Sequence, residues 1–197
     1  FYGADAAVAP PYGPGLRPDG YDMDFLDQES LLQLEFADGH LVTPGGARYR
    51  LLALRPGLER MNADTLRKLC ALAEDGATIL GDRPKGPLGL VTKDRDFRTL
   101  ANRLWLKDGT GRRLGQGRVY ANMSMADGLA LMGVSPDLSS PAMPLNWTHR
   151  QIDDGDLYFV SNPSREAFRG TIAVRAENAP PDARVEAWDA ATVQKTS

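Results

Sequence analysis

The segment from Tyr21 to Asp82 decides the fold. It opens with Tyr21-Asp-Met-Asp-Phe25, continues into a short leucine-rich helix expected over 27–34, and turns at Asp38-Gly39. The apolar run Tyr49-Arg-Leu-Leu-Ala-Leu54 follows, then an amphipathic helix and the run Ala77-Thr-Ile-Leu-Gly-Asp82. Short apolar runs on either side of a helical pattern predict two buried strands and therefore a β-α-β unit.

The spacing of apolar residues predicts the crossover helix of this unit. Asn62 is the expected N-cap and Gly76 ends the helix. Four residues at i, i+3, i+4 and i+7 form one apolar face: Leu66, Leu69, Cys70 and Ala73. A second helical pattern covers 97–104, a strand is expected over 118–121, and a third helix follows Ser124. This alternation predicts a parallel sheet with right-handed crossovers.

After about residue 144 the sequence pattern changes from alternating strands and helices to short strands separated by turns. Strands separated by turn clusters are expected over 145–150, 156–161, 168–176 and 184–189. Their even spacing predicts the start of an antiparallel sandwich, and four strands bury too little surface alone, so we expect an incomplete module. Residues 1–20 are rich in proline and glycine and are expected to be a linker or a loop that lies on another domain.

Composition excludes several classes of function. The net charge of −3 among 197 residues gives no basic footprint for nucleic acid. No apolar run approaches the roughly 20 residues that span a bilayer. The one cysteine excludes an internal disulfide framework. The chain starts at Phe1 and ends on a strand-like segment, so we expect a piece of a longer protein, and the sequence leaves the compartment open.

The loop that starts at Asp82 and Arg83 is one candidate ligand site. It follows the carboxyl end of the second predicted strand, the edge at which open α/β sheets bind ligands. Arg83 and Lys85 could hold an anion there. The glycine fingerprints of nucleotide-binding loops are absent, which disfavours a nucleotide.

A second candidate is Trp147-Thr-His149-Arg150. A strand places Trp147 and His149 on one face and Arg150 on the other. This group could meet a sugar or lie at a seam between domains, and the sequence favours the seam.

Other chemistry-bearing residues favour structural roles. Cys70 lies on the apolar helix face, where a cysteine acts as a small hydrophobe. Asp22, Asp24 and Asp27 could bind calcium or act as acid and base, but Asp27 is better explained as a helix cap. No G-x-S-x-G elbow supports a hydrolase triad.

A set of segments covers nearly the whole chain in a fixed order: Phe1-Tyr-Gly-Ala-Asp5, Gly20-Tyr-Asp-Met-Asp24, Gln28–Leu32, Asp38–Pro44, Tyr49–Leu54, Met61–Gly81, Gly117-Arg-Val119, Pro136-Asp137, Trp147–Arg150, Asp156–Asn162 and Glu186-Ala-Trp-Asp189. Their order and spacing resemble glycoside hydrolase family 106, the α-L-rhamnosidases.

The resemblance implies a large multidomain parent, periplasmic or secreted, whose catalytic carboxylates and calcium lie on an upstream (β/α)₈ barrel. It implies that 1–20 leads out of the barrel and that 21–143 is a three-layer α/β domain of the glutamine-amidotransferase-like or flavodoxin-like type. Residues 144–197 would begin a β-sandwich. No residue here matches a catalytic glutamate of the family, so no catalytic or metal residue is assigned.

Three hypotheses follow. The first is a non-catalytic accessory part of an enzyme that removes terminal α-L-rhamnose from polysaccharides or glycosides. Its partners would be the barrel and the downstream sandwich of the same chain, with no cofactor of its own. The second is a free-standing α/β ligand-binding domain that uses the 81–86 loop. The third is an amidotransferase-like enzyme that depends on Cys70.

Overall fold

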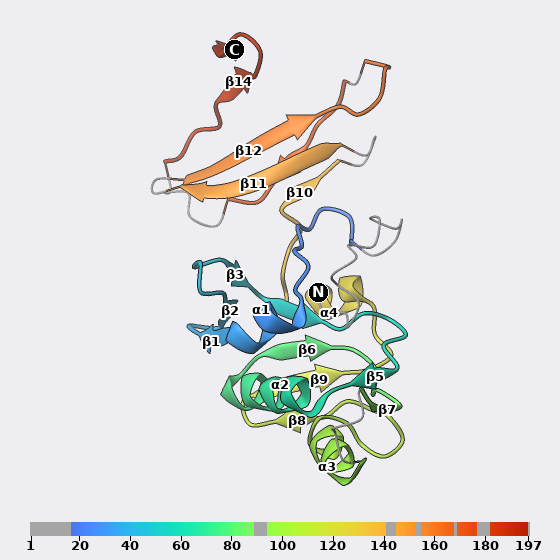
Figure 1. Ribbon diagram of the computed structural model, residues 1–197. Coiled ribbons are helices and arrows are strands. Elements are labelled where there is room, and N and C mark those ends of the chain that lie inside the picture. The colour runs from blue at the N-terminus through green and yellow to red at the C-terminus, as the bar shows by residue number, and fades with distance from the viewer. Residues whose placement is uncertain are drawn as a thin grey trace. The chain divides into compact units, whose positions relative to one another are not determined.

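The computed structural model describes residues 17–88, 94–140, 145–152, 155–167, 169–176 and 182–196 (Figure 1). The chain forms two compact units. The first contains Met23–Val134, and the second contains Asp19–Asp22 and Ser135–Ser197. Most of the predicted linker, up to residue 16, lies outside the described residues. Among the helices described, none is long and apolar enough to cross a membrane.

A four-stranded sheet organises the first unit. Its order is β4 (Leu51–Ala53), β6 (Thr78–Leu80), β9 (Gly117–Tyr120) and β8 (Arg113–Leu114). β4, β6 and β9 are parallel, as the strand-helix alternation predicted. β8 is antiparallel to β9 and reaches it through a tight turn at Gly115, whose φ of 58° favours glycine.

Helices α1, α2 and α4 begin where short polar side chains can accept hydrogen bonds from their first free N–H groups. Asp27 accepts from the Ser30 N–H and Asn62 from the Thr65 N–H, so both predicted caps are confirmed. The hydrogen bonds from Ser30 lower the pKa of Asp27. The helices of this unit are α1 (Gln28–Gln33), α2 (Ala63–Asp75), α3 (Asp94–Leu104) and α4 (Met125–Leu131).

The apolar run over 49–54 was expected to be one strand, and it forms two. Tyr49 ends β3 (Arg48–Tyr49), the chain bends at Arg50, and β4 begins at Leu51. The two strands pair in different sheets. Side-chain pattern alone does not show where a strand exchanges one partner for another, because both parts are apolar. The remaining strands of the unit are β1 (Glu35–Ala37) and β2 (His40–Val42), antiparallel with β3, and β5 (Arg60–Met61), parallel with β7 (Gly86–Pro87).

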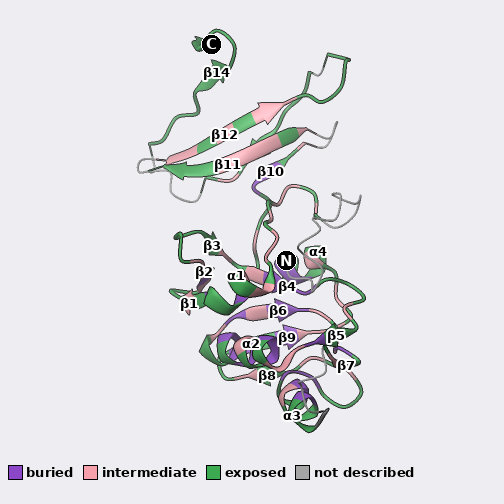
Figure 2. Ribbon diagram, in the orientation of Figure 1, coloured by how far each residue is buried: buried purple, intermediate pink, exposed green. Residues whose placement is uncertain are grey.

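The hydrophobic core lies between the sheet and helices α1, α2 and α3 (Figure 2). Its members include Leu52, Ile79 and Val119, one from each parallel strand. A smaller cluster around Ala53 and Leu80 lies on the opposite face. Such alternation along each strand places apolar side chains on both faces, as a parallel sheet that is covered on both sides requires.

Trp105 joins α3 to the sheet. Its side chain is fully buried, and its indole Nε1–H donates to the Gly81 carbonyl at 2.9 Å, just beyond the end of β6. Gly81 has a φ of 153°, and a Cβ there would lie 2.5 Å from Leu54 Cβ, so the acceptor position demands glycine. The end of α3 and the carboxyl end of β6 are therefore held together by one residue.

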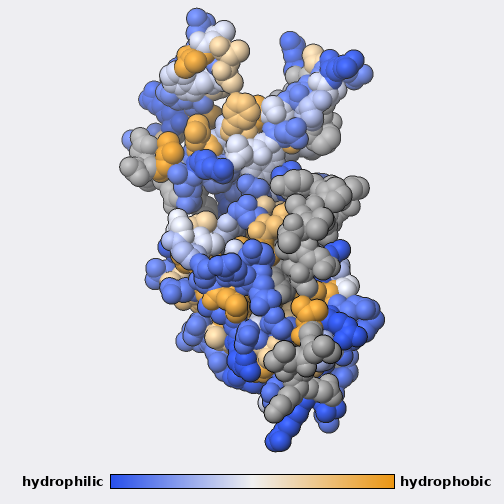
Figure 3. Space-filling model, viewed as in Figure 1, coloured by the Kyte–Doolittle hydropathy of each residue, from blue (hydrophilic) through white to orange (hydrophobic). Residues whose placement is uncertain are grey.

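The second unit is built from strand pairs with little apolar burial. Leu138 is the one buried hydrophobic residue among the described residues of this unit. Figure 3 shows that hydrophilic residues cover most of the visible surface, with hydrophobic residues in small separate groups. The antiparallel pairs are β10 (Leu138–Ser139) with β13 (Ala173–Val174), β11 (Asn146–Ile152) with β12 (Gly155–Ser161), and β14 (Ala187–Asp189) with β15 (Gln194–Thr196).

We predict that Trp105→Phe lowers the free energy of unfolding by about 1–3 kcal/mol, because it removes the indole donor and leaves a gap in the core. Urea unfolding followed by circular dichroism measures the change. Trp188→Phe is the matched control, since Trp188 is 57% exposed, and should change stability by less than about 0.5 kcal/mol. Equal effects of the two substitutions would contradict the role of Trp105.

Candidate functional site

The carboxyl edge of the parallel sheet holds Asp82 and Arg83, but both side chains are bonded within the unit. Asp82 Oδ1 accepts from the Asn122 backbone N–H at 2.8 Å. Arg83 Nη2 donates to Asn102 Oδ1 at 2.9 Å, and Nη1 lies 3.5 Å from the Trp105 carbonyl. Arg83 therefore braces the C-terminal end of α3, where a cation also complements the helix dipole.

Asn122 occupies the turn between β9 and α4 with a φ of 54°. A residue held in this conformation between a strand and a helix has the backbone setting of a nucleophile elbow. An asparagine amide cannot act as the nucleophile, however, and its neighbour Ser124 is the N-cap of α4, bonded to the Asp127 N–H. Neither Asn122 nor Ser124 is therefore placed to act as a nucleophile in this turn.

Cys70 is buried, as its position on the apolar face of α2 predicted. Burial raises the pKa of its thiol to about 11, and its Sγ lies 3.8 Å from the Leu100 carbonyl on α3. A thiol in this setting is protonated at neutral pH and is not a nucleophile. It packs as part of the contact between two helices.

The hairpin β11–β12 carries the second candidate group. Its register pairs His149 with Tyr158 and Trp147 with Val160. Trp147 and His149 share a face, as predicted, and Arg150 lies on the other. Arg150 donates to Thr148 Oγ1 at 3.2 Å and to the His149 carbonyl at 2.8 Å. The three candidates Trp147, His149 and Arg150 therefore do not converge on one site.

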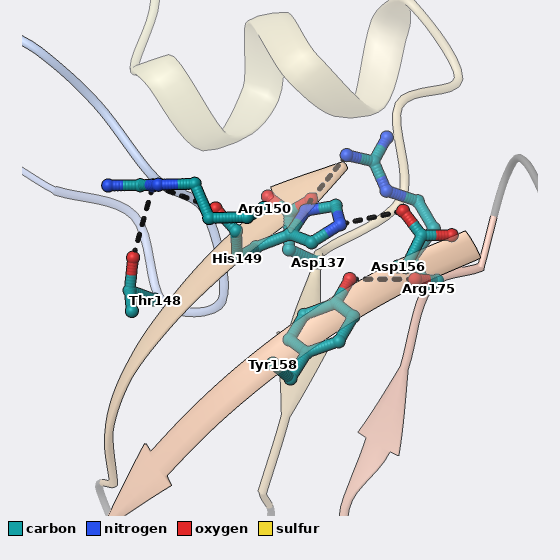
Figure 4. Close-up of polar contacts among 7 residues, drawn as sticks. All are labelled: Asp137, Thr148, His149, Arg150, Asp156, Tyr158 and Arg175. Atoms are coloured by element: carbon teal, nitrogen blue, oxygen red, sulfur yellow. Dashed lines mark hydrogen bonds and ion pairs between the residues drawn. The ribbon is translucent and has the colours of Figure 1, made fainter. Parts of the chain in front are cut away.

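His149 lies instead between two carboxylates (Figure 4). Its Nδ1 is 3.2 Å from Asp137 Oδ1 and its Nε2 is 2.8 Å from Asp156 Oδ1. The imidazole is stacked on the Tyr158 ring, with centroids 4.3 Å apart and an interplanar angle of 3°. Arg175 completes the group through an ion pair with Asp137. We call these five residues the polar cluster.

The polar cluster connects two of the strand pairs of the second unit, β10–β13 and β11–β12. Asp137 precedes β10, Arg175 follows β13, and the other three members belong to the hairpin. The Tyr158 hydroxyl donates to the Arg175 carbonyl at 2.7 Å, and the Arg175 N–H donates to the Asp137 carbonyl at 2.8 Å. The side chains are largely shielded, with 3% of Asp156, 10% of Asp137 and 13% of His149 exposed.

Burial, and then the charges of Asp137 and Asp156, raise the pKa of Tyr158 to about 12. Its hydroxyl is therefore a neutral donor throughout the physiological range. Among the described residues, no group of three or more His, Cys, Asp or Glu side chains could hold a metal ion. Two of the acidic residues that were considered as calcium or acid-base candidates are bonded within the structure. Asp24 accepts a hydrogen bond from the Tyr49 hydroxyl, and Asp27 caps α1.

Sequence reasoning identified His149 but missed the four residues that surround it. Strand alternation could have placed Asp156 and Tyr158 on the face of His149, once the hairpin register was known. Asp137 and Arg175 come from segments far apart in the chain, and no local sequence pattern predicts that they form an ion pair.

Comparison with known proteins identifies the class. A solved rhamnosidase from Novosphingobium sp. PP1Y is 29% identical and superimposes with a TM-score of 0.66, over 75% of this chain and 15% of that one. A protein from Formosa agariphila, provisionally named beta-glucuronidase, is 29% identical over 183 residues, 90% of this chain and 14% of that protein. Both names are those of glycosidases.

The family described as alpha-L-rhamnosidase, glycoside hydrolase family 106, matches residues 1–197. The chain belongs to this family, as the order of its motifs indicated. It spans about a seventh of the length of these relatives.

We predict that Tyr158→Phe lowers the stability of the second unit by about 1 kcal/mol, because it removes the hydrogen bond to Arg175. Hydrogen exchange of the amides in β11 and β12 measures this loss. Phe159→Tyr is the control, because it adds a hydroxyl on the opposite face of the same strand, where the Phe159 side chain is 54% exposed. This variant should leave the exchange rates of β11 and β12 unchanged. Faster exchange in both variants would contradict a specific role for the Tyr158 hydroxyl.

We also predict that a disulfide reagent labels Cys70 slowly in the folded chain. The raised pKa alone lowers the thiolate fraction about 100-fold, and burial adds a steric barrier. Labelling is compared at pH 7.5 with and without denaturant. Labelling of the folded chain at the denatured rate would show that the thiol is accessible and reactive.

Proposed function

We propose that this chain is a non-catalytic accessory part of a glycoside hydrolase that removes terminal α-L-rhamnose from polysaccharides or glycosides. One observation carries the proposal. The shielded carboxylates of Asp137 and Asp156 lie on either side of the His149 ring, which contacts both of them, at 3.2 Å and 2.8 Å. A pair that cleaves a glycosidic bond has to leave the space between its two carboxylates to the sugar and a water molecule.

The carboxyl edge of the parallel sheet supports the same proposal. Asp82 and Arg83 are used to hold β9 and α3 in place, and the elbow position is an asparagine. Cys70, on which an amidotransferase reaction would depend, is buried with its pKa raised. These residues stabilise the unit, which is the behaviour expected of a scaffold.

In this proposal the chain supports a catalytic barrel elsewhere in the same polypeptide. The first unit would be an amidotransferase-like three-layer domain and the second the start of a β-sandwich, with each packing on its neighbour in the parent. The catalytic carboxylates and the calcium would belong to the barrel. Rhamnose is favoured over glucuronate as the sugar because the family and the solved relative are both described by rhamnose cleavage.

The purified chain should release no nitrophenol from p-nitrophenyl α-L-rhamnopyranoside or β-D-glucuronide above the rate in buffer. The physical reason is the lack of a free carboxylate pair at either candidate place. A known rhamnosidase serves as the positive control for the assay. Turnover that follows the chain through purification, and that Asp156→Asn abolishes, would overturn the proposal.

The ligand-binding alternative is tested by thermal unfolding with saturating L-rhamnose, D-glucuronate, ATP or phosphate. A ligand that binds only the folded chain raises its Tm. We expect no shift, because Arg83 is already bonded to Asn102. A shift that Arg83→Ala removes would favour a binding domain that uses the 81–86 loop.

A further inference from the structure

We infer that the exposed ring of Trp188, with Glu186 and Lys195 beside it, binds a pyranose ring of the polysaccharide on which the parent enzyme acts. The inference deepens the proposed function and rests on it for the class of ligand, a chain of pyranose sugars. It gives the accessory part a role in holding the substrate rather than in cleaving it.

Trp188 is the middle residue of β14 and is 57% exposed, whereas Trp105 is fully buried. Tryptophan is highly buried on average, so an exposed indole needs an explanation. A pyranose ring carries C–H groups that pack on an aromatic face, while the hydroxyls at its rim form hydrogen bonds. In rhamnose the methyl group at C6 enlarges the apolar part of the sugar. An exposed indole flanked by polar groups matches this mixture of surfaces.

The indole of Trp188 is held from its polar edge. Its side chain forms a hydrogen bond with Glu186, and the pKa of the Glu186 carboxyl is lowered first by Lys195 and then also by this bond. The indole N–H is the one hydrogen-bonding group of a tryptophan side chain. With that group bonded to Glu186, Trp188 offers a ligand its aromatic face.

Glu186 and Lys195 supply the polar groups of the site. Lys195 is the cross-strand partner of Trp188, and its Nζ donates to Glu186 Oε1 at 2.5 Å. Directly opposite residues of an antiparallel pair have Cβ atoms about 4.5–5.5 Å apart. Both charged side chains are half-exposed. A carboxylate has several acceptor positions and an ammonium has three N–H groups, so the pair keeps hydrogen-bonding capacity for neighbouring sugar hydroxyls.

The turn between β14 and β15 is closed by its own hydrogen bonds. Asp189 Oδ1 accepts from the backbone N–H groups of Ala191 and Thr192, and it also accepts from the Thr192 hydroxyl. The Val193 N–H donates to the Asp189 carbonyl. These bonds support the strand register that places Trp188 opposite Lys195. A preformed arrangement loses less conformational entropy when it binds a ligand.

One sugar ring on one indole gives weak binding, because a single contact hardly offsets the translational and rotational freedom lost on association. A free monosaccharide therefore binds too weakly to raise the Tm. A polysaccharide presents many equivalent rings to the site. In the parent, a chain that is also held by the catalytic barrel would gain from the raised effective concentration.

Titration of the nitrogen-15-labelled 197-residue chain with a neutral α-rhamnan, followed by NMR of the indole N–H signals, tests the inference. The chain has three tryptophans, and Trp188→Phe assigns the spectrum. We expect the Trp188 signal to shift with rhamnan concentration and the Trp105 signal to stay in place. Polyethylene glycol, a polymer without pyranose rings, should shift neither signal.

Three results of this titration overturn the inference. The first is a Trp188 signal that does not move. The second is an equal shift with polyethylene glycol, which would show contact without recognition of sugar. The third is a shift of the Trp147 signal alone, which would place the sugar contact on β11.

Two variants separate a sugar site from general apolar contact. Glu186→Gln removes the charge that accepts from Lys195 and from sugar hydroxyls, and it should weaken rhamnan binding by about tenfold. Val185→Ala removes a neighbouring apolar side chain that is 91% exposed, and it should leave the affinity unchanged. An equal loss in both variants, or no loss with Glu186→Gln, overturns the assigned site.

These outcomes are distinct from those that test the proposed function. A chain that fails to bind rhamnan and releases no nitrophenol loses the sugar site alone. Turnover of the nitrophenyl glycosides overturns the proposed function, whatever the indole signals show.

Discussion

The first unit depends on the contact between the Trp105 indole and the Gly81 carbonyl. A buried tryptophan contributes large apolar area, and its one N–H needs a partner in the interior. Here the partner is the first carbonyl beyond β6, so the same bond fixes the end of α3 and the start of the loop that contains Asp82 and Arg83. The loop conformation at the carboxyl edge of the sheet is a consequence of core packing.

The second unit is organised by a different interaction. With Leu138 as the buried hydrophobic residue of its described part, apolar burial cannot be its main support. The polar cluster supplies the cross-connections among β10, β11, β12 and β13. Removal of Asp137 or Arg175 would leave the other member of their ion pair without this partner in a shielded site, which is costly. The cluster is also directional, so it specifies how the strand pairs meet.

Local sequence signals predicted the first unit better than the second. Caps such as Asp27 and Asn62 and the apolar face of α2 act within one or two turns of a helix, so they are readable from spacing alone. The break between β3 and β4 was missed because it depends on the partner strands. The three-layer classification and the sandwich stay predictions. Among the site residues, His149 was visible as a polar residue that shares a strand face with Trp147, whereas Asp137 and Arg175 meet only through tertiary structure.

The two units use their charged residues in the same way. At the two candidate sites, described polar side chains form hydrogen bonds or ion pairs with other segments of the same unit. Asp82 bonds Asn122, Arg83 bonds Asn102, and the carboxylates of the polar cluster bond His149 and Arg175. A catalytic group has to keep a lone pair or a proton free for its substrate. Residues whose bonding capacity is taken up in this way hold separate segments of one unit together.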